Sequence, residues 1–262
     1  MELSLKNKRA FVCGASKGIG LAAAVELAAL GATVTLIARN EAALQQAEGT
    51  LSTEFGQQHE YIPADFIDVD AVGRIARDYA AQRGPVHILV NNSGGPPPGL
   101  AINASVNDFA AVFAQHLMVS QLLVQAFVPG MKAAGYGRIV NIISTSVKQP
   151  IKGLGVSNTI RGAMASWSKT LAGELGGFGI TVNNVLPGST DTGRMKELIA
   201  GKAKTGGRTE AEIMADDIAT IPVGRFAKPA EVGAAIAFLA SPAASYINGI
   251  NLPVDGGKTL SL

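Results

Sequence analysis

Short apolar runs rich in β-branched residues alternate along the chain with longer segments in which apolar residues recur at helical spacing. The short runs predict strands at residues 9–13, 33–38, 60–64, 87–91, 138–143, 181–186 and 249–253. The longer segments predict helices at 18–30, 42–55, 68–82, 105–132, 157–175 and 229–239. Because strands that alternate with helices form parallel sheets, we expect an α/β fold with a doubly wound, seven-stranded parallel sheet covered by helices on both faces.

The strand–helix rhythm is interrupted once. Residues 193–219 are rich in Gly, Lys and Thr and precede the last predicted helix. Long insertions of this kind often cover active sites, so we expect one domain spanning residues 1–262 with a mobile lid at 193–219.

Composition narrows the class of protein further. Hydrophobic residues make up 47% of the chain and charged residues 16%, which fits a sheet covered on both faces. A net charge of +2 without a dense run of Lys and Arg argues against a nucleic-acid partner.

Apolar stretches such as 234–240 are far shorter than the roughly 20 residues of a membrane span, so we expect no membrane partner. A lone cysteine, Cys13, and a start without signal-peptide features predict a cytoplasmic protein.

A glycine-rich loop follows the first predicted strand and opens the next helix. Glycines allow positive φ and a close approach of the backbone, and the free N–H groups of a helix start attract a diphosphate. This strand–loop–helix order predicts a Rossmann-type dinucleotide site, whereas a loop that only allows tight helix packing is the alternative. The candidate binding residues are Gly14, Ser16, Lys17, Gly18, Ile19 and Gly20.

The end of the second predicted strand bears on the choice of cofactor. A protein that prefers NAD places an acidic residue there, but this chain has Arg39. Arg39, together with Lys17, offers positive charge to a 2′-phosphate, so we expect NADP(H) as the cofactor. The alternative is that both side chains are solvated surface charges.

Several further motifs carry a resemblance to a known family. Asn91-Asn92-Ser93-Gly94, the run 187–192 and the later motifs at 224–226, 229–232 and 254–257 follow in order. With the glycine loop they resemble the short-chain dehydrogenase/reductase family, and in particular its 3-oxoacyl-carrier-protein reductase-like members. The resemblance implies further cofactor contacts at Asp65 for the adenine, Asn91 and Gly94 for the ribose, and Pro187, Gly188 and Thr192 for the nicotinamide. Helix capping by Asp65, strand stitching by Asn91 and a simple turn at Pro187-Gly188 are the alternatives.

The family's catalytic residues are only partly present. The family uses a serine, a tyrosine about thirteen residues later, a lysine four residues beyond the tyrosine, and an asparagine on the preceding helix. Ser144 matches the serine, but Ser157 and Arg161 stand at the tyrosine and lysine positions, and His116 stands at the asparagine position. A serine hydroxyl is a far weaker acid than a phenol.

A rebuilt proton relay is one hypothesis for this altered site. His116 would titrate near neutrality, Ser144 and Ser157 would donate hydrogen bonds, and Arg161 would supply positive charge. The alternative is that His116 is a buried histidine satisfied by the backbone.

The sequence therefore favours an NADP(H)-dependent oxidoreductase that interconverts a carbonyl and a secondary alcohol of a small molecule by hydride transfer, with an altered proton relay. A catalytically impaired nucleotide-binding sensor or scaffold, and a non-redox lyase or isomerase on the same fold, are the alternatives. Surplus apolar residues on two predicted helices, at 105–132 and 157–175, indicate helices paired between subunits, and the family resemblance implies a homotetramer or homodimer.

Overall fold

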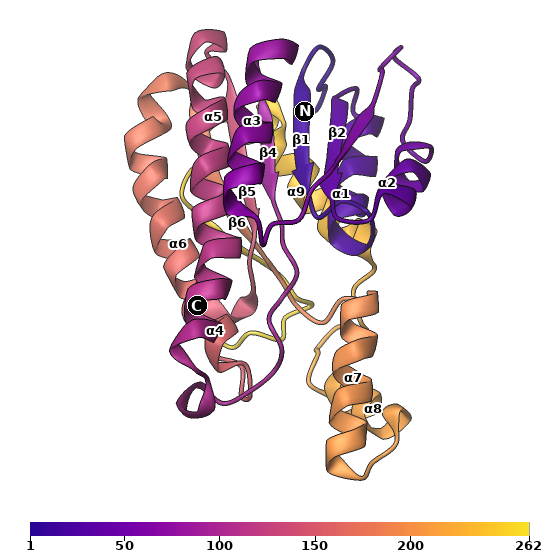
Figure 1. Ribbon diagram of the computed structural model, residues 1–262. Helices are drawn as coiled ribbons and strands as arrows, with labels where there is room; N and C mark the ends of the chain where they lie inside the picture. The colour runs from indigo at the N-terminus through magenta and orange to yellow at the C-terminus, as the bar shows by residue number, and fades with distance from the viewer. Residues whose placement is uncertain (262) are drawn as a thin grey trace.

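A single parallel sheet forms the centre of the protein (Figure 1). The computed structural model describes residues 1–261, apart from the side chain of Thr205. The strand order is β3-β2-β1-β4-β5-β6-β7, and the predicted seven-stranded parallel sheet is confirmed. The strands are β1 (Arg9–Cys13), β2 (Thr33–Ala38), β3 (Glu60–Pro63), β4 (Ile88–Asn91), β5 (Gly137–Ile142), β6 (Ile180–Pro187) and β7 (Asn251–Val254).

The strand order reverses between β1 and β4, which defines a crevice at the carboxyl ends of these two strands. Ligands of open parallel sheets bind at such a reversal, because the loops that leave the two strands run in opposite directions. The glycine loop follows β1 and the Asn91–Gly94 loop follows β4, so both predicted cofactor motifs open into this crevice.

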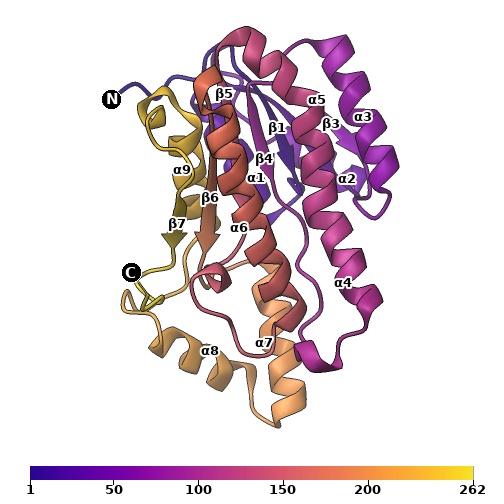
Figure 2. The same ribbon diagram turned by 90° about the vertical axis from the view of Figure 1, so that its left-hand side faces the viewer.

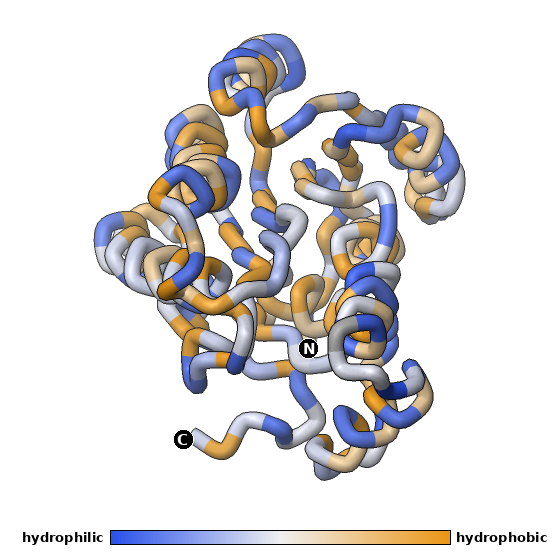
Figure 3. The backbone as a smooth tube through the Cα atoms, turned by 60° about the horizontal axis from the view of Figure 1, so that its bottom comes forward, coloured by the Kyte–Doolittle hydropathy of each residue, from blue (hydrophilic) through white to orange (hydrophobic). Residues whose placement is uncertain are grey.

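Helices cover both faces of the sheet (Figures 1 and 2). On one face the apolar residues of α1 (Gly18–Ala29), α2 (Glu41–Glu48) and α9 (Pro229–Ala240) form a core with β1, β2 and β4. On the other face a second core joins the sheet to α3 (Val69–Arg83), α5 (Val119–Ala134) and α6 (Gly155–Leu175). Figure 3 shows apolar residues on the segments at the centre of the molecule and hydrophilic residues mainly on the outer turns.

Two predicted helices differ from the observed ones. The helix predicted at 42–55 ends at Glu48, because the chain turns after Gly49 and buries Leu51 in the core. The helix predicted at 105–132 is divided into α4 (Val106–Phe113), a π-helical turn at Ala114–Met118 and α5. The π-helical turn carries His116, and turns of this kind often mark functional sites.

The continuous helix Val106–Ala134 is long and apolar enough to span a membrane by length and composition, contrary to the expectation from the sequence. Its residues Val119, Leu123 and Phe127 are buried in the core that this helix forms with α3 and the sheet. Burial in this core accounts for the apolar character of the helix, as it does for core helices of other folds.

The segment predicted as a lid contains α7 (Gly193–Gly206) and α8 (Glu210–Ala219), which extend beyond the carboxyl end of the sheet (Figure 1). Polar contacts tie this segment to the rest of the chain. Arg194 donates a hydrogen bond to the Pro96 carbonyl oxygen, and Asp217 forms an ion pair with Lys258. The mobility of this segment stays a prediction.

Candidate active site

The glycine loop has the backbone shape that its sequence predicts. Gly14 and Gly18 have φ values of +58° and +62°, which side chains other than glycine rarely adopt. A Cβ atom on Gly14 would lie 2.7 Å from Asn92 Nδ2. Asn92 Nδ2 donates to the carbonyl oxygens of Cys13 and Gly14 at 3.3 and 3.2 Å. Asn92 thus fixes the loop from β4, a role that the sequence analysis did not assign to it.

The amino end of α1 fits an anion. The helix begins at Gly18, and the residue at its N-cap, Lys17, makes no side-chain capping hydrogen bond. Side chains cap α2, α3, α4, α7 and α8, whereas the N-cap residues of α6 and α9 also make no side-chain capping hydrogen bond. The first-turn N–H groups of α1 therefore remain available to a ligand, and the helix dipole favours a negative one. Ser16, Ile19 and Gly20 lie in this same loop and turn.

The two basic residues predicted to recognise a 2′-phosphate are both exposed at the crevice. Arg39 follows β2, and Lys17 precedes α1. A Cβ atom placed on Gly193 would lie 3.9 Å from Lys17 Nζ. A Cβ atom placed on Gly18 would lie 3.5 Å from Thr192 Cγ2. The start of α7 therefore borders the glycine loop, which brings Thr192 to the predicted cofactor site.

The remaining predicted cofactor residues lie at strand ends. Asp65 follows β3 and is exposed, and its side chain accepts a hydrogen bond from the Ile67 N–H at 3.1 Å. Asp68, not Asp65, caps α3, so the alternative role of Asp65 as that helix's N-cap is wrong. Pro187 ends β6, and a Cβ atom on Gly188 would lie 2.7 Å from the Asp255 Cα atom.

Asn91 belongs to a line of asparagines that crosses the sheet. Its Nδ2 donates to Asn141 Oδ1 on β5 at 2.8 Å, so the strand-stitching role is observed. Asn141 donates in turn to Asn184 on β6, and Asn184 donates to Asn251 on β7. Asn91 Oδ1 is buried and has no hydrogen-bond partner among the described residues. A buried acceptor left over at the crevice is a group that a ligand or a water molecule can satisfy.

We expect Gly14→Ala to abolish dinucleotide binding and to lower stability by about 1–3 kcal/mol, because the new methyl group meets Asn92 in a strained backbone conformation. Gly173→Ala is the matched control, since Gly173 lies in α6 and a Cβ atom there meets nothing within 4 Å. Thermal unfolding and fluorescence titration with NADPH measure both effects. If the Gly14 variant binds NADPH as tightly as the Gly173 variant, the loop is not the diphosphate site.

The structure brings three of the predicted site residues together. Asn91, His116 and Arg161 line one small cavity of about 10 Å³, together with Ser93. Ser144 follows β5, and Ser157 lies in the first turn of α6, one helical turn before Arg161. Ser144 and Ser157 are both half-buried and are not among the residues that line this cavity.

Arg161 is a buried cation without a carboxylate partner among the described residues. Its Nη1 donates to the Ile142 carbonyl oxygen at 3.0 Å. Burial lowers the pKa of the guanidinium to about 10, so it still carries its proton at neutral pH. Arg161 can therefore supply positive charge to the site but cannot pass a proton onward.

His116 does not titrate near neutrality, so that part of the sequence hypothesis is wrong. Its side chain is 3% exposed. Burial, and in second place the positive charge of Arg161, lower the pKa of the imidazole to about 3. Both effects disfavour the charged form of the ring. His116 is therefore neutral over the physiological range.

This depressed pKa predicts a loss of stability in mild acid. The unfolded chain takes up a proton on this histidine near pH 6.5, whereas the folded chain does not until about pH 3. The free energy of unfolding should therefore fall by about 2 kcal/mol between pH 7.5 and pH 5 on account of His116. Urea unfolding at the two pH values measures the fall, and His116→Gln should remove that part of it. An equal fall in both proteins would contradict the assigned pKa.

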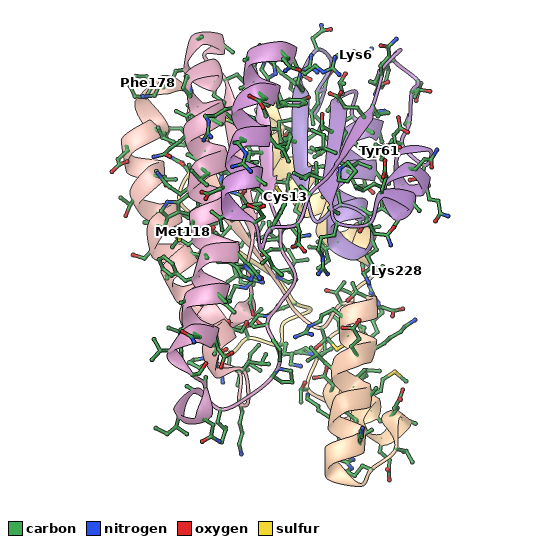
Figure 4. The ribbon with its side chains drawn as sticks, viewed as in Figure 1. Lys6, Cys13, Tyr61, Met118, Phe178 and Lys228 are labelled. Atoms are coloured by element: carbon green, nitrogen blue, oxygen red, sulfur yellow. The ribbon has the colours of Figure 1, made fainter. Side chains whose placement is uncertain are left out.

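Cys13 has no part in nucleophilic chemistry. It is 1% exposed within the core, and burial raises the pKa of its thiol to about 12. Figure 4 shows Cys13 inside the body of the molecule, whereas Met118 lies on the outer side of the long helix. Within residues 1–261 no cluster of His, Cys, Asp and Glu is suited to a metal ion.

Known proteins resemble this chain over its whole length. A family model described as enoyl-(acyl carrier protein) reductase matches residues 14–259. Gluconate 5-dehydrogenase of Gluconobacter oxydans is 32% identical, covering 99% of this chain and 97% of that protein. The 3-oxoacyl-[acyl-carrier-protein] reductase of Pseudomonas aeruginosa is 32% identical, covering 99% of this chain and all of that protein.

A solved structure gives the same result. L-sorbose reductase from Gluconobacter frateurii, in complex with NADPH and L-sorbose, superposes with a TM-score of 0.93 at 30% identity, with all of both chains covered. The chain therefore belongs to the short-chain dehydrogenase/reductase family, whose named relatives are dehydrogenases and reductases.

Proposed function

We propose that the protein is an NADP(H)-dependent oxidoreductase that interconverts a carbonyl and a secondary alcohol of a small molecule. The observation that carries this proposal is the uncapped amino end of α1, which lies in a glycine loop at the strand-order reversal. Lys17 and Arg39 beside this loop favour a cofactor with a 2′-phosphate, since neither is opposed there by an acidic side chain at the end of β2.

The residues that would hold the cofactor lie on five loops, which follow β1, β2, β3, β4 and β6. The Ser16–Gly20 turn would bind the diphosphate, and Arg39 and Lys17 would bind the 2′-phosphate. Asp65 would contact the adenine. Asn91 and Gly94 would border the ribose, and the nicotinamide would be bordered by Pro187, Gly188 and Thr192. The bound nicotinamide supplies or accepts the hydride, and the protein's contribution is to orient the substrate carbon beside it.

Ser144 and Ser157 would act as hydrogen-bond donors to the substrate carbonyl oxygen. Both hydroxyl groups are half-buried, and Ser157 lies one helical turn from the positive charge of Arg161. Donors and a nearby cation stabilise the negative charge that develops on this oxygen during hydride transfer. The proton itself would come from water, because neither serine nor Arg161 is an adequate acid at neutral pH. Reduction should therefore be slow compared with a site that holds a tyrosine.

The names of the relatives narrow the class of substrate to be tested. Relatives act on gluconate, L-sorbose, D-threitol and 3-oxoacyl groups, according to their names. We propose a hydroxylated ketone or the corresponding polyol as the first class to test, with 3-oxoacyl thioesters as the second. The experiment measures NADPH and NADH binding by fluorescence and then NADPH oxidation with each class. Tight binding of NADH in preference to NADPH would refute the cofactor assignment.

A nucleotide-binding sensor or scaffold without reductase activity is the second candidate. The replacement of tyrosine and lysine by Ser157 and Arg161 favours it, because it removes the usual proton donor. NADPH binding without turnover of any substrate would support this candidate. A lyase or isomerase reaction in which Arg161 binds an anionic substrate has less support, since Arg161 is buried and already donates to Ile142.

Assembly and location also belong to this proposal. Phe113 and Met118 on the long helix are exposed apolar side chains, 38% and 47% accessible, which fits an interface between copies of the chain. We propose a cytoplasmic homodimer or homotetramer. Light scattering on the purified protein gives the mass that decides between these two.

A further inference from the structure

Ser93 and His116 form a close hydrogen-bonded pair at the crevice. Ser93 Oγ lies 2.6 Å from His116 Nδ1 and 3.3 Å from Nε2. Nε2 lies 3.1 Å from the Gly94 carbonyl oxygen. The ring thus contacts two successive residues of the loop that follows β4. Ser93 belongs to the Asn91–Gly94 motif, but the sequence alone indicates no role for it.

The partners fix the tautomer of the ring. A carbonyl oxygen can only accept, so Nε2 must carry a hydrogen and donate it to Gly94. Nδ1 is then the acceptor, and the Ser93 hydroxyl must be its donor at 2.6 Å. Each polar atom of the neutral imidazole is satisfied by one partner from this loop.

The long helix holds the ring firmly in place. His116 lies in the π-helical turn, where the Val119 N–H donates to the Ala114 carbonyl oxygen. Ser120 Oγ donates to the His116 carbonyl oxygen at 2.6 Å. The backbone of residue 116 is therefore anchored in the helix, while its side chain reaches across to the loop.

A serine beside a histidine also occurs in enzymes that use serine as a nucleophile, but this pair does not suit that chemistry. A nucleophile needs a base that takes up its proton near neutral pH. The other titratable groups lining the cavity are Arg161 and Cys13, and the cation of Arg161 opposes a second positive charge on the ring. No carboxylate lines this cavity to stabilise an imidazolium.

We propose that Ser93 and His116 are a positioning pair that locks the Ser93–Gly94 backbone in the shape required by the nicotinamide ribose. This inference rests on the proposed function, because Gly94 matters only if the crevice binds a dinucleotide. The neutral ring connects the π-helical turn to the loop after β4 through its two hydrogen bonds. His116 is accordingly a positioning residue and does not transfer a proton.

The test compares two serine-to-alanine changes, one beside the ring and one far from it. Ser93→Ala removes the donor to Nδ1, whereas Ser241→Ala removes a buried hydroxyl of equal size that donates to the Phe238 carbonyl oxygen in α9. We expect Ser93→Ala to weaken NADPH binding about tenfold, the loss of roughly one hydrogen bond. Ser241→Ala should leave NADPH binding unchanged, and Ser93→Thr, which keeps the hydroxyl, should bind NADPH as the natural protein does.

Nitrogen-15 NMR of the histidines gives a second readout that does not depend on the cofactor. In the natural protein without ligand, His116 should show a protonated Nε2, a hydrogen-bonded Nδ1 and no titration between pH 5 and pH 8. Ser93→Ala should shift the Nδ1 resonance, and Ser241→Ala should not.

The outcomes separate this inference from the proposed function. If His116 carries its hydrogen on Nδ1, or if the two alanine variants bind NADPH equally well, the positioning pair is wrong while the oxidoreductase proposal stands. If the natural protein binds no NADPH, the proposed function is wrong. The positioning role is then wrong too, regardless of what the NMR spectrum of His116 shows.

Discussion

A variant that carries both Ser157→Tyr and Arg161→Lys should reduce its ketone substrate about 10²- to 10⁴-fold faster than the natural protein. The phenol has an ordinary pKa near 10, and a neighbouring ammonium group stabilises its ionised form, so it can exchange a proton with the carbonyl oxygen at neutral pH. Position 157 is half-buried, so the larger ring is not forced into the core. Residue 161 lies four positions later on the same helix face.

The matched control is Ser157→Phe with Arg161→Lys, which introduces the ring and the ammonium group without the acidic hydroxyl. The measurement is kcat for NADPH oxidation with the best ketone found in the substrate screen. We expect only the tyrosine variant to accelerate the reaction. Equal rates in the two double variants would show that proton supply at this position does not limit the enzyme.

Arg39→Asp should weaken NADPH binding roughly 100-fold and leave NADH binding unchanged or improved. The change removes a charge-assisted contact to the 2′-phosphate and places a negative charge beside it. The new carboxylate can instead accept a hydrogen bond from the 2′-hydroxyl of NADH. Fluorescence titration with both dinucleotides measures the two dissociation constants.

Arg74→Asp controls for the change in net charge, because Arg74 is exposed on α3 and lies outside the loops that form the crevice. We expect its NADPH affinity to stay close to that of the natural protein. A uniform loss of affinity for NADPH and NADH in the Arg39 variant would instead mean that Arg39 acts on the protein fold or on the diphosphate.

The sequence predicted the features that depend on local order along the chain. Strand, glycine loop and helix follow one another at residues 9–30, so the anion site at α1 could be inferred before the sheet order was known. The basic residue at the end of β2 is equally local, since Arg39 directly follows Ala38. The family motifs added residues from β4 and β6, and the strand-order reversal brings these loops to one crevice.

The sequence could not predict what depends on the surroundings of a side chain. His116 was expected to titrate near neutrality, because its ordinary pKa lies there. Its burial and the nearby Arg161 cation, which together lower the pKa to about 3, come from contacts between separate elements. The hydrogen bond between Ser93 and His116 joins residues 23 positions apart, and no spacing pattern in the sequence predicts it. The Asn91–Asn251 line likewise exists only because strand register aligns its four members.

The most direct test of the central claim follows the hydride itself. The purified protein is incubated with NADPH deuterated at C4, on each face of the ring in turn, and with the ketone classes named above, and the alcohol products are examined by mass spectrometry. The account predicts that one of the two labelled cofactors gives a product with deuterium on its carbinol carbon. NADPH that binds tightly while no product acquires deuterium from either cofactor would contradict it.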